Sequence, residues 1–213
     1  MTEPARHGRA CILTSEMTDS TSVPATAVGQ RPGKRERLVA AAAQLLHEQG
    51  IERTTLADIA KTADVPAGNV YYYFKTKDEV IAAVIEARIQ QVKMTLAAID
   101  AQHRSPKSRL KAFVREFTAQ AEIVAQHGCP LGSLCSELGK RVKLPGFAAA
   151  ELMRLPIKWA EEQFESLDCR DAHDLATDLM AAYEGSALLA NTMGDPSILS
   201  SAARRLGRWI DTL

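Results

Sequence analysis

The chain has 213 residues, of which 46% are hydrophobic, and its 26 basic and 26 acidic side chains give a formal net charge of zero. Zero net charge excludes a generic nucleic-acid coat protein, and the lack of about 18 consecutive apolar residues excludes a membrane-spanning helix. Because no apolar stretch follows basic residues at the N-terminus, we expect no secretory signal, a cytoplasmic location and free thiols at all 4 cysteines.

The N-terminal segment and the stretch that follows it differ in pattern. Residues 1–30 are rich in Ser, Thr, Pro and Ala without periodicity, which predicts a disordered tail. Residues 34–49 place apolar side chains at helical spacing, and Gly50 is a stop signal, so we expect a first helix that ends there.

Residues 55–74 predict two short helices joined by a tight turn. Thr55 is followed three residues later by Asp58, which is typical of a capping box, and Pro66 is expected in the first turn of the second helix. Val70, Tyr73 and Phe74 are expected to face inward. The outward face is small at its leading end and aromatic at its trailing end, so it can enter the major groove of DNA while its tyrosines reach phosphates. That face consists of Ala67, Gly68, Asn69, Tyr71 and Tyr72.

A third element is expected to begin directly after these helices. Thr76 and Glu79 have the spacing of a second capping box, which predicts a helix over residues 77–98. Lys77 in its first turn carries the wrong charge for a helix N-terminus. A phosphate bound at Lys77 would explain that choice of residue.

This stretch resembles the DNA-binding segment of TetR-type transcriptional regulators. The shared pattern is filled here by Gly50, Ile51, Thr54, Thr55, Ile59, Ala60, Val65, Gly68, Val70, Tyr71, Phe74, Lys75 and Lys77. The resemblance implies that phosphates of double-stranded DNA are held by Thr54, Thr55, Tyr71, Tyr72 and Lys77, and that Ala67, Gly68 and Asn69 lie nearest the bases. The family usually has Ser-Lys where this chain has Pro66-Ala67, so a side-chain cap and a cation are missing at the front of the recognition helix.

The remainder of the chain also has helical periodicity and no strand pattern. We expect helices over residues 110–121, 131–138, 146–164, 171–191 and 197–212, with Pro156 kinking or dividing the third of these. The expected fold is all-α. It comprises the tail over residues 1–30, a helix-turn-helix "head" over residues 31–80, and a helical "body" for ligand binding and dimerisation over residues 81–213.

Three interpretations of Cys129 remain open. It is a buried apolar thiol, or a sensor of oxidants and electrophiles, as some members of the resembling family are, with a thiol pKa lowered at a helix N-terminus. The third and weakest interpretation is an enzyme nucleophile paired with His127, because no strand-turn-helix elbow or orienting acid is evident. The spacing of His127, Cys129 and Cys135 matches no common zinc pattern, so we expect no metal, no cofactor and no enzymatic activity.

The body is expected to form a homodimer and to bind a small molecule. By resemblance, its last two helices pair with those of a second subunit, with Leu206 and Trp209 at the interface. An effector pocket among the body helices is expected to draw on Phe117, Cys129, Leu134, Met153, Phe164, Met180 and Tyr183. The resemblance implies repression of transcription that a small molecule relieves. Because Lys and Arg are sparse on these faces, we expect this effector to be hydrophobic.

Overall fold

The computed structural model describes residues 32–140 and 146–213, and it describes the side chains of these residues apart from those of 146–148. Within these ranges the chain is helical throughout its regular structure and has no strand, as expected. Their contacts place them in one compact unit, so the boundary between residues 80 and 81 stays a prediction. The tail over residues 1–30 and Cys11 lie outside the described residues.

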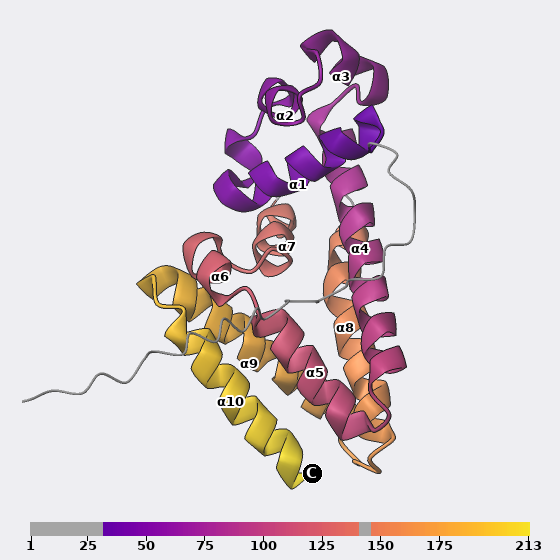
Figure 1. Cartoon of the computed structure of the whole chain (residues 1–213), viewed down its shortest axis with the longest axis vertical. Coiled ribbons are helices and arrows are strands. Elements are labelled where there is room, and N and C mark those ends of the chain that lie inside the picture. Colours follow the sequence, from indigo (N-terminus) through magenta and orange to yellow (C-terminus); the bar gives the residue numbers. More distant parts are fainter. Residues whose placement is uncertain (1–31, 141–145) are drawn as a thin grey trace, which may run out of the picture. The chain divides into compact units, whose positions relative to one another are not determined.

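The head contains α1 (Lys34–Arg53), α2 (Leu56–Thr62) and α3 (Ala67–Tyr73), which lie at the top of Figure 1. Its small core is built from apolar side chains that are almost fully buried, among them Leu38, Ile59, Val70 and Phe74. Gly50 interrupts α1 with a φ of 81°, a backbone region that favours glycine. The predicted stop at Gly50 is therefore confirmed, and one further turn reaches Arg53.

The helix caps of the head follow local sequence signals. Thr55 Oγ1 accepts from Asp58 N at 3.1 Å, and Asp58 Oδ2 accepts from Thr55 N at 3.1 Å, which confirms the predicted capping box. Pro66 is the N-cap of α3, one position earlier than expected. At α4, Thr76 Oγ1 caps Glu79 N as expected, but the Glu79 carboxylate accepts from Lys75 N instead of returning to Thr76.

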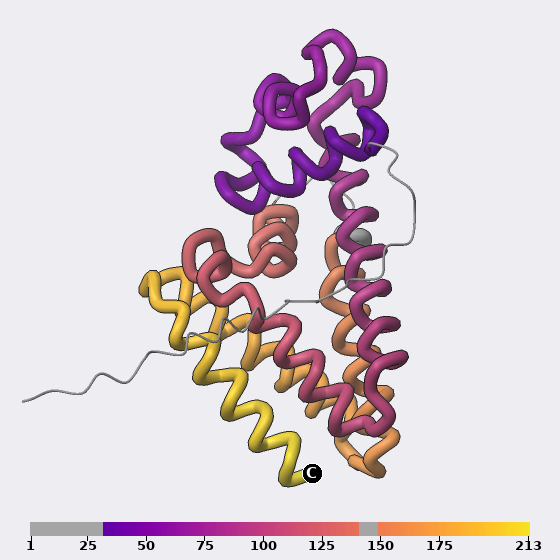
Figure 2. Tube along the Cα trace, viewed as in Figure 1, coloured from indigo at the N-terminus to yellow at the C-terminus, as the bar shows by residue number. Residues whose placement is uncertain are grey.

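The body is a set of packed helices: α4 (Lys77–Gln102), α5 (Pro106–Thr118), α6 (Ala121–His127), α7 (Gly132–Gly139), α8 (Gly146–Glu165), α9 (Ala172–Met193) and α10 (Ser197–Thr212). Helix α8 contacts both α4 and α9, while α10 contacts α9 and α5. In the Cα trace, α6 and α7 lie between the head and helices α5, α9 and α10 (Figure 2), and both contact α1. The body core includes a stacked pair of rings, Phe113 and Trp159, whose centroids are 5.3 Å apart.

Two expectations for the body helices need correction. The predicted helix over residues 110–121 is two helices, because Gln120 has a non-helical ψ of 38° and α6 begins only at Ala121. Pro156 lies inside α8 without dividing it, so division is wrong, while a kink at Pro156 stays a prediction. No helix in the described part of the chain combines the length and apolar character that crossing a membrane requires.

Candidate functional sites

The leading end of α3 carries small, accessible side chains and is held against the head core by a buried residue. Ala67 and Gly68 are exposed and Asn69 is half-buried. A Cβ atom added at Gly68 would meet no atom within 4 Å. Beneath this surface Val70 is buried to 1% exposure, so it fixes the orientation of the helix. The result is a rigid, low-profile surface of the kind that can approach base edges in a groove.

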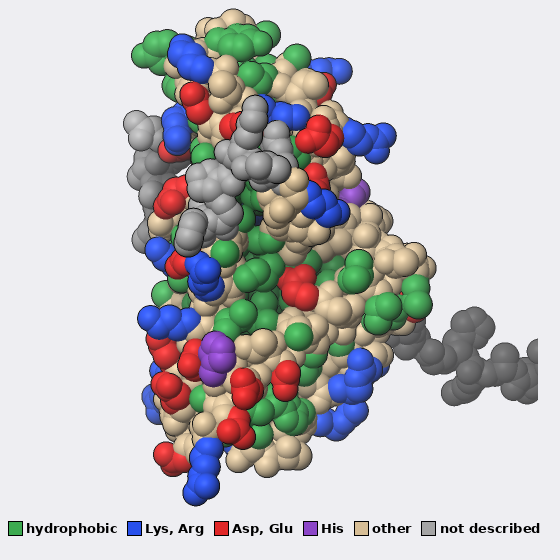
Figure 3. Space-filling model, turned by 180° about the vertical axis from the view of Figure 1, so that it is seen from behind, with side chains coloured by type: hydrophobic (Ala, Val, Ile, Leu, Met, Phe, Trp, Pro, Cys, Tyr) green, Lys and Arg blue, Asp and Glu red, His purple; other side chains and the backbone are tan. Residues whose placement is uncertain are grey.

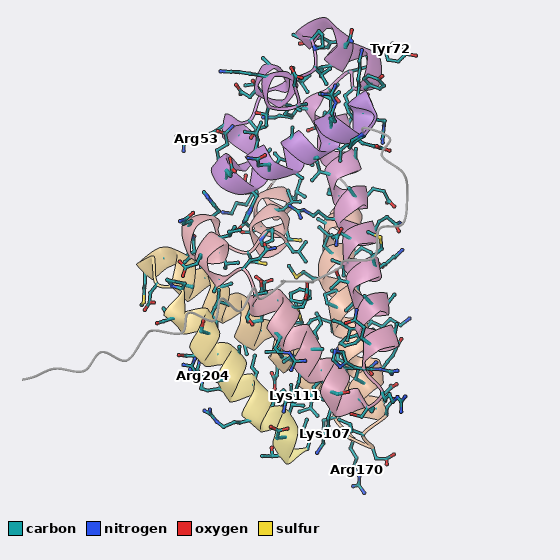
Figure 4. The ribbon with its side chains drawn as sticks, viewed as in Figure 1. Arg53, Tyr72, Lys107, Lys111, Arg170 and Arg204 are labelled. Carbon is teal, nitrogen blue, oxygen red and sulfur yellow. The ribbon has the colours of Figure 1, made fainter. Side chains whose placement is uncertain are left out.

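The trailing end of α3 presents two exposed phenols. Tyr71 is 55% exposed and Tyr72 is 79% exposed. The Tyr72 ring meets the Tyr73 ring edge-on at 5.0 Å, and its side chain extends away from the head (Figure 4). Neither hydroxyl of Tyr71 or Tyr72 is hydrogen-bonded to any residue that the structure describes, so both can donate to a phosphate.

The two threonines before α2 have different environments. Thr55 is exposed, with its hydroxyl 2.6 Å from Asp58 Oδ2. Thr54 is 0% exposed, and its hydroxyl donates to Gly50 O at 2.8 Å. Burial leaves Thr54 no surface for a phosphate, so the structure argues against the role predicted for it. Thr54 instead fixes the turn that follows the break in α1.

Lys77 has an intramolecular role that explains its place at a helix N-terminus. Its Nζ donates to Ile51 O at 2.8 Å and to Thr54 O at 3.1 Å, and so satisfies carbonyls at the end of α1. A phosphate is therefore not needed to explain this residue, and the phosphate contact stays a prediction, for which the ammonium has a third N–H. Arg53 was not among the residues predicted to contact DNA, but it extends from the end of α1 into solvent (Figure 4). The sequence signal for such a contact was a basic residue immediately before Thr54.

The body holds the break in α1 through two hydrogen bonds. Glu137 Oε2 of α7 accepts from Ile51 N at 2.7 Å. His47 Nε2 lies 2.8 Å from Gly128 O, an acceptor, so His47 donates. Burial is the main cause that lowers the pKa of His47, which favours its neutral form. These bonds connect the C-cap of α6 and helix α7 to the head.

A cavity of about 180 Å³ lies among α4, α5, α6, α9 and the segment before α7. Three of the predicted pocket residues, Phe117, Cys129 and Tyr183, line it. The other predicted residues do not line it and contribute to the core: Leu134, Phe164 and Met180 are buried and Met153 is half-buried against it. The sequence reasoning missed Arg88, Gln91, Val92, Thr95, Glu116, Gln120, Val124, Pro130 and Leu131.

Cys129 is a buried, hydrogen-bonded thiol. Its Sγ donates to Glu184 Oε1 at 3.2 Å and accepts from the Tyr183 hydroxyl at 3.6 Å and from Gly132 N at 3.4 Å. Burial, followed by the nearby Glu184 carboxylate, raises the pKa of Cys129 to about 12. The predicted sensor needed a lowered thiol pKa, so the structure contradicts its physical basis.

The other chemical readings of this region also lack a site. The His127 ring lies edge-on against the ring of His47, with centroids 5.7 Å apart, and makes no hydrogen bond to Cys129. Among the residues that the structure describes, no three His, Cys, Asp or Glu side chains are placed to hold a metal ion.

The apolar surface of the body lies on α9 more than at the residues predicted from the sequence. Leu206 and Trp209 are half-buried against the core, and the Trp209 ring lies 5.7 Å from that of Phe164. In contrast, Leu188 and Met193 are each 67% exposed on α9. Seen from behind, hydrophobic side chains gather over the middle of the molecule (Figure 3). Such a patch is typical of a protein interface.

Comparisons with known proteins agree with this arrangement. Residues 38–84 match the family model described as bacterial regulatory proteins, tetR family. An HTH-type transcriptional regulator from the lacX 3' region of Lactococcus lactis is 28% identical over 183 residues, 78% of this chain and 88% of its own length. The regulator BetI of Burkholderia thailandensis is 27% identical over 191 residues, 87% of this chain and 96% of its own.

Solved structures show the same fold. The regulatory protein TetR from Rhodobacter sphaeroides superposes with a TM-score of 0.71 at 27% identity, over 82% of this chain and 97% of that one. A TetR transcriptional regulator from Legionella pneumophila gives a TM-score of 0.73 at 22% identity, over 83% of this chain and 97% of that one. The similarity therefore extends from the head through the body.

Proposed function

This chain is a transcriptional regulator of the TetR family, and from that premise we propose that it is a cytoplasmic, homodimeric repressor. In this proposal it binds a double-stranded DNA operator and leaves it when a small, mainly hydrophobic effector enters the body. No catalytic step is part of the proposal.

The observation that carries the DNA-binding role is the exposed face of α3. Its leading surface of Ala67, Gly68 and Asn69 is small enough to enter the major groove, with Asn69 as the side chain able to pair with a base edge. At the trailing end, Tyr71 and Tyr72 offer exposed hydroxyls that have no hydrogen-bond partner among the described residues. Thr55 and the third N–H of Lys77 complete the proposed phosphate contacts. These contacts position the helix, while Asn69 contributes sequence preference.

The proposed dimer is supported by the apolar surface of α9. One recognition helix reads too few base pairs to define a unique site, whereas a twofold dimer presents two helices to successive major grooves. Leu188 and Met193 supply exposed apolar area, and Leu206 and Trp209 of α10 lie on the neighbouring helix. We place the interface on α9 and α10 together, with α9 supplying most of the buried apolar surface.

The proposed response to an effector is a shift between two positions of the heads. The 180 Å³ cavity includes Cys129 and Leu131, which directly precede α7. Helix α7 in turn holds Ile51 N of the head through Glu137. An effector that binds one arrangement of this segment more tightly than the other changes the head spacing, and only such differential affinity can move the equilibrium.

The experiment that tests this function combines an effector screen with DNA release. The purified dimer is screened by thermal shift against hydrophobic and charged compounds, and each hit is added to a complex with an operator selected from random DNA. We expect hydrophobic hits that lower operator affinity. Hits restricted to highly charged, polar compounds would contradict the proposed pocket chemistry, and hits that leave operator affinity unchanged would contradict the repressor mechanism.

A further inference from the structure

Arg88 on α4 is a half-buried cation that has no counter-charge among the described residues. It lies one helical turn from Val84 and Val92, both buried, so its side chain is directed to the same side of α4. It makes no hydrogen bond or ion pair with any residue that the structure describes. Burial lowers the pKa of Arg88, which reports the cost of removing the guanidinium from water. A partly desolvated charge that lacks a partner destabilises the folded chain.

Arg88 lines two hollows, which share Arg88 and Gln91 of α4. One is the 180 Å³ cavity of the body. The other is a groove of about 590 Å³ whose lining comes from α1 and α4 alone. The guanidinium therefore lies where the cavity approaches the head, and its positive charge also contributes to the lowered pKa of His47 on α1. A ligand that pairs with Arg88 changes the electrostatic environment of α1.

The remaining lining of the cavity suits a ligand that is apolar over most of its surface and negatively charged at one end. Phe117 and Tyr183 form an edge-on pair with centroids 5.4 Å apart, next to Val92, Val124 and Leu131. Among the described residues that line this cavity, Arg88 is the one cation and Glu116, exposed, is the one anion. The Tyr183 hydroxyl already donates its hydrogen bond to Cys129 Sγ, so the guanidinium of Arg88 is the main donor available to a ligand.

We propose that the effector is a small amphipathic anion, whose apolar ring or branched chain lies against Phe117 and Tyr183 and whose carboxylate pairs with Arg88. This inference rests on the proposed function and specifies the chemistry of its effector. A dry cavity of about 150 Å³ holds benzene, so 180 Å³ suits one ring with a short substituent. A planar guanidinium matches a carboxylate with two parallel hydrogen bonds. Pairing would draw the guanidinium away from the α1 groove and toward the cavity.

Three probes of similar size test the charge requirement: benzoate, benzyl alcohol and benzylamine. Binding to the full-length protein is measured by isothermal titration calorimetry at pH 7.5. We expect benzoate to bind wild type about ten- to one-hundredfold more tightly than benzyl alcohol, the range expected for a charge-assisted hydrogen-bonded pair. Arg88→Gln should abolish that preference, and Arg88→Lys should restore part of it. Arg115→Gln, which removes an exposed arginine of α5, is the matched control and should leave it intact.

A second measurement separates a binding role from a structural one. Arg88→Met removes the unpaired charge while keeping a flexible side chain, so it should raise the melting temperature of the ligand-free protein by about 2–4 °C. A fall in melting temperature would show that Arg88 supports the fold. Equal binding of benzoate and benzyl alcohol, tighter binding of benzylamine, or no benzoate binding would each overturn the proposal.

Operator binding distinguishes failure of this inference from failure of the proposed function. If the ligand-free protein binds a selected operator but benzoate neither binds the protein nor weakens that complex, the proposed anion site is refuted and the proposed repressor function stands. If the ligand-free protein selects no DNA sequence, the proposed function itself fails. With both correct, benzoate should weaken operator binding by wild type and by Arg115→Gln, but not by Arg88→Gln.

Discussion

Replacement of Leu188 by alanine tests whether α9 forms the dimer interface. Leu188 is 67% exposed in the single chain, so a partner subunit can bury about two-thirds of its side chain. Full burial of a leucine side chain contributes about 1.5–3 kcal/mol, which gives roughly 1–2 kcal/mol for this fraction. A twofold interface contains the residue twice, so the dimer should lose roughly 2–4 kcal/mol.

This loss corresponds to a rise in the dimer dissociation constant of roughly 30- to 700-fold, at about 1.4 kcal/mol per factor of ten. Sedimentation velocity over a range of protein concentrations measures it. Met94→Ala is the matched control, because Met94 is 60% exposed but lies on α4. An unchanged dissociation constant for Leu188→Ala, or an equal rise for Met94→Ala, would refute the assignment of the interface to α9.

Four further predictions address the remaining sites. Trp209→Glu should produce monomers of reduced stability, because Trp209 also packs against Phe164; a folded variant that sediments as a dimer would remove Trp209 from the interface. Tyr71→Phe should weaken binding to every DNA sequence by about 1 kcal/mol, the value of one hydrogen bond, and a change in sequence preference in fluorescence anisotropy would contradict a phosphate contact. In mass spectrometry at pH 7.5, Cys129 should react with iodoacetamide more slowly than Cys169, because burial raises the pKa of Cys129 to about 12; faster labelling of Cys129 would revive the thiol sensor. The folded-state pKa of His47 lies below its ordinary 6.5, so folding stability should be unaffected by this group above pH 6.5 and should fall as the pH drops further; urea unfolding of wild type and His47→Gln between pH 7.5 and 5 should show a smaller fall in the variant, and equal falls would contradict the linkage.

The head was predictable because its signals are local. A capping box places its two partners three residues apart, so Thr55 and Asp58 identify the start of α2 without knowledge of the fold. The positive φ at Gly50 is likewise a property that one residue type favours. The exposure of Tyr71 and Tyr72 follows from helical geometry, since four consecutive aromatic residues cannot all face one core.

The sites of the body depend on contacts between distant segments, and there the sequence was less informative. Phe117 and Phe164 have the same side chain, yet one lines a cavity and the other is fully buried, which depends on how helices distant in the sequence pack together. Burial and then Glu184, 55 residues away, raise the pKa of Cys129, and together they outweigh the lowering effect of the hydrogen bond from Gly132 N at the start of α7. Thr54 was predicted to contact a phosphate because the sequence does not reveal its burial, although the hydrogen bond from its hydroxyl to Gly50 O is local.

Arg88 is the exception, since a usable signal was present. Arg88 lies four residues from both Val84 and Val92 on α4, so helical periodicity predicts an apolar side chain at this position. A charged residue on a buried helix face is uncommon unless it has a partner or a ligand. That pattern identifies a candidate binding residue from the sequence alone.

Selection of DNA from a random pool by the purified full-length protein tests the central claim most directly. The account predicts that sequencing recovers an inverted repeat whose half-sites lie about one helical turn, or a multiple of it, apart. It also predicts that Asn69→Ala recovers a site altered at particular base pairs within each half. Recovery of no preferred sequence by wild type, or of an identical site by Asn69→Ala, would contradict the reading of DNA through α3.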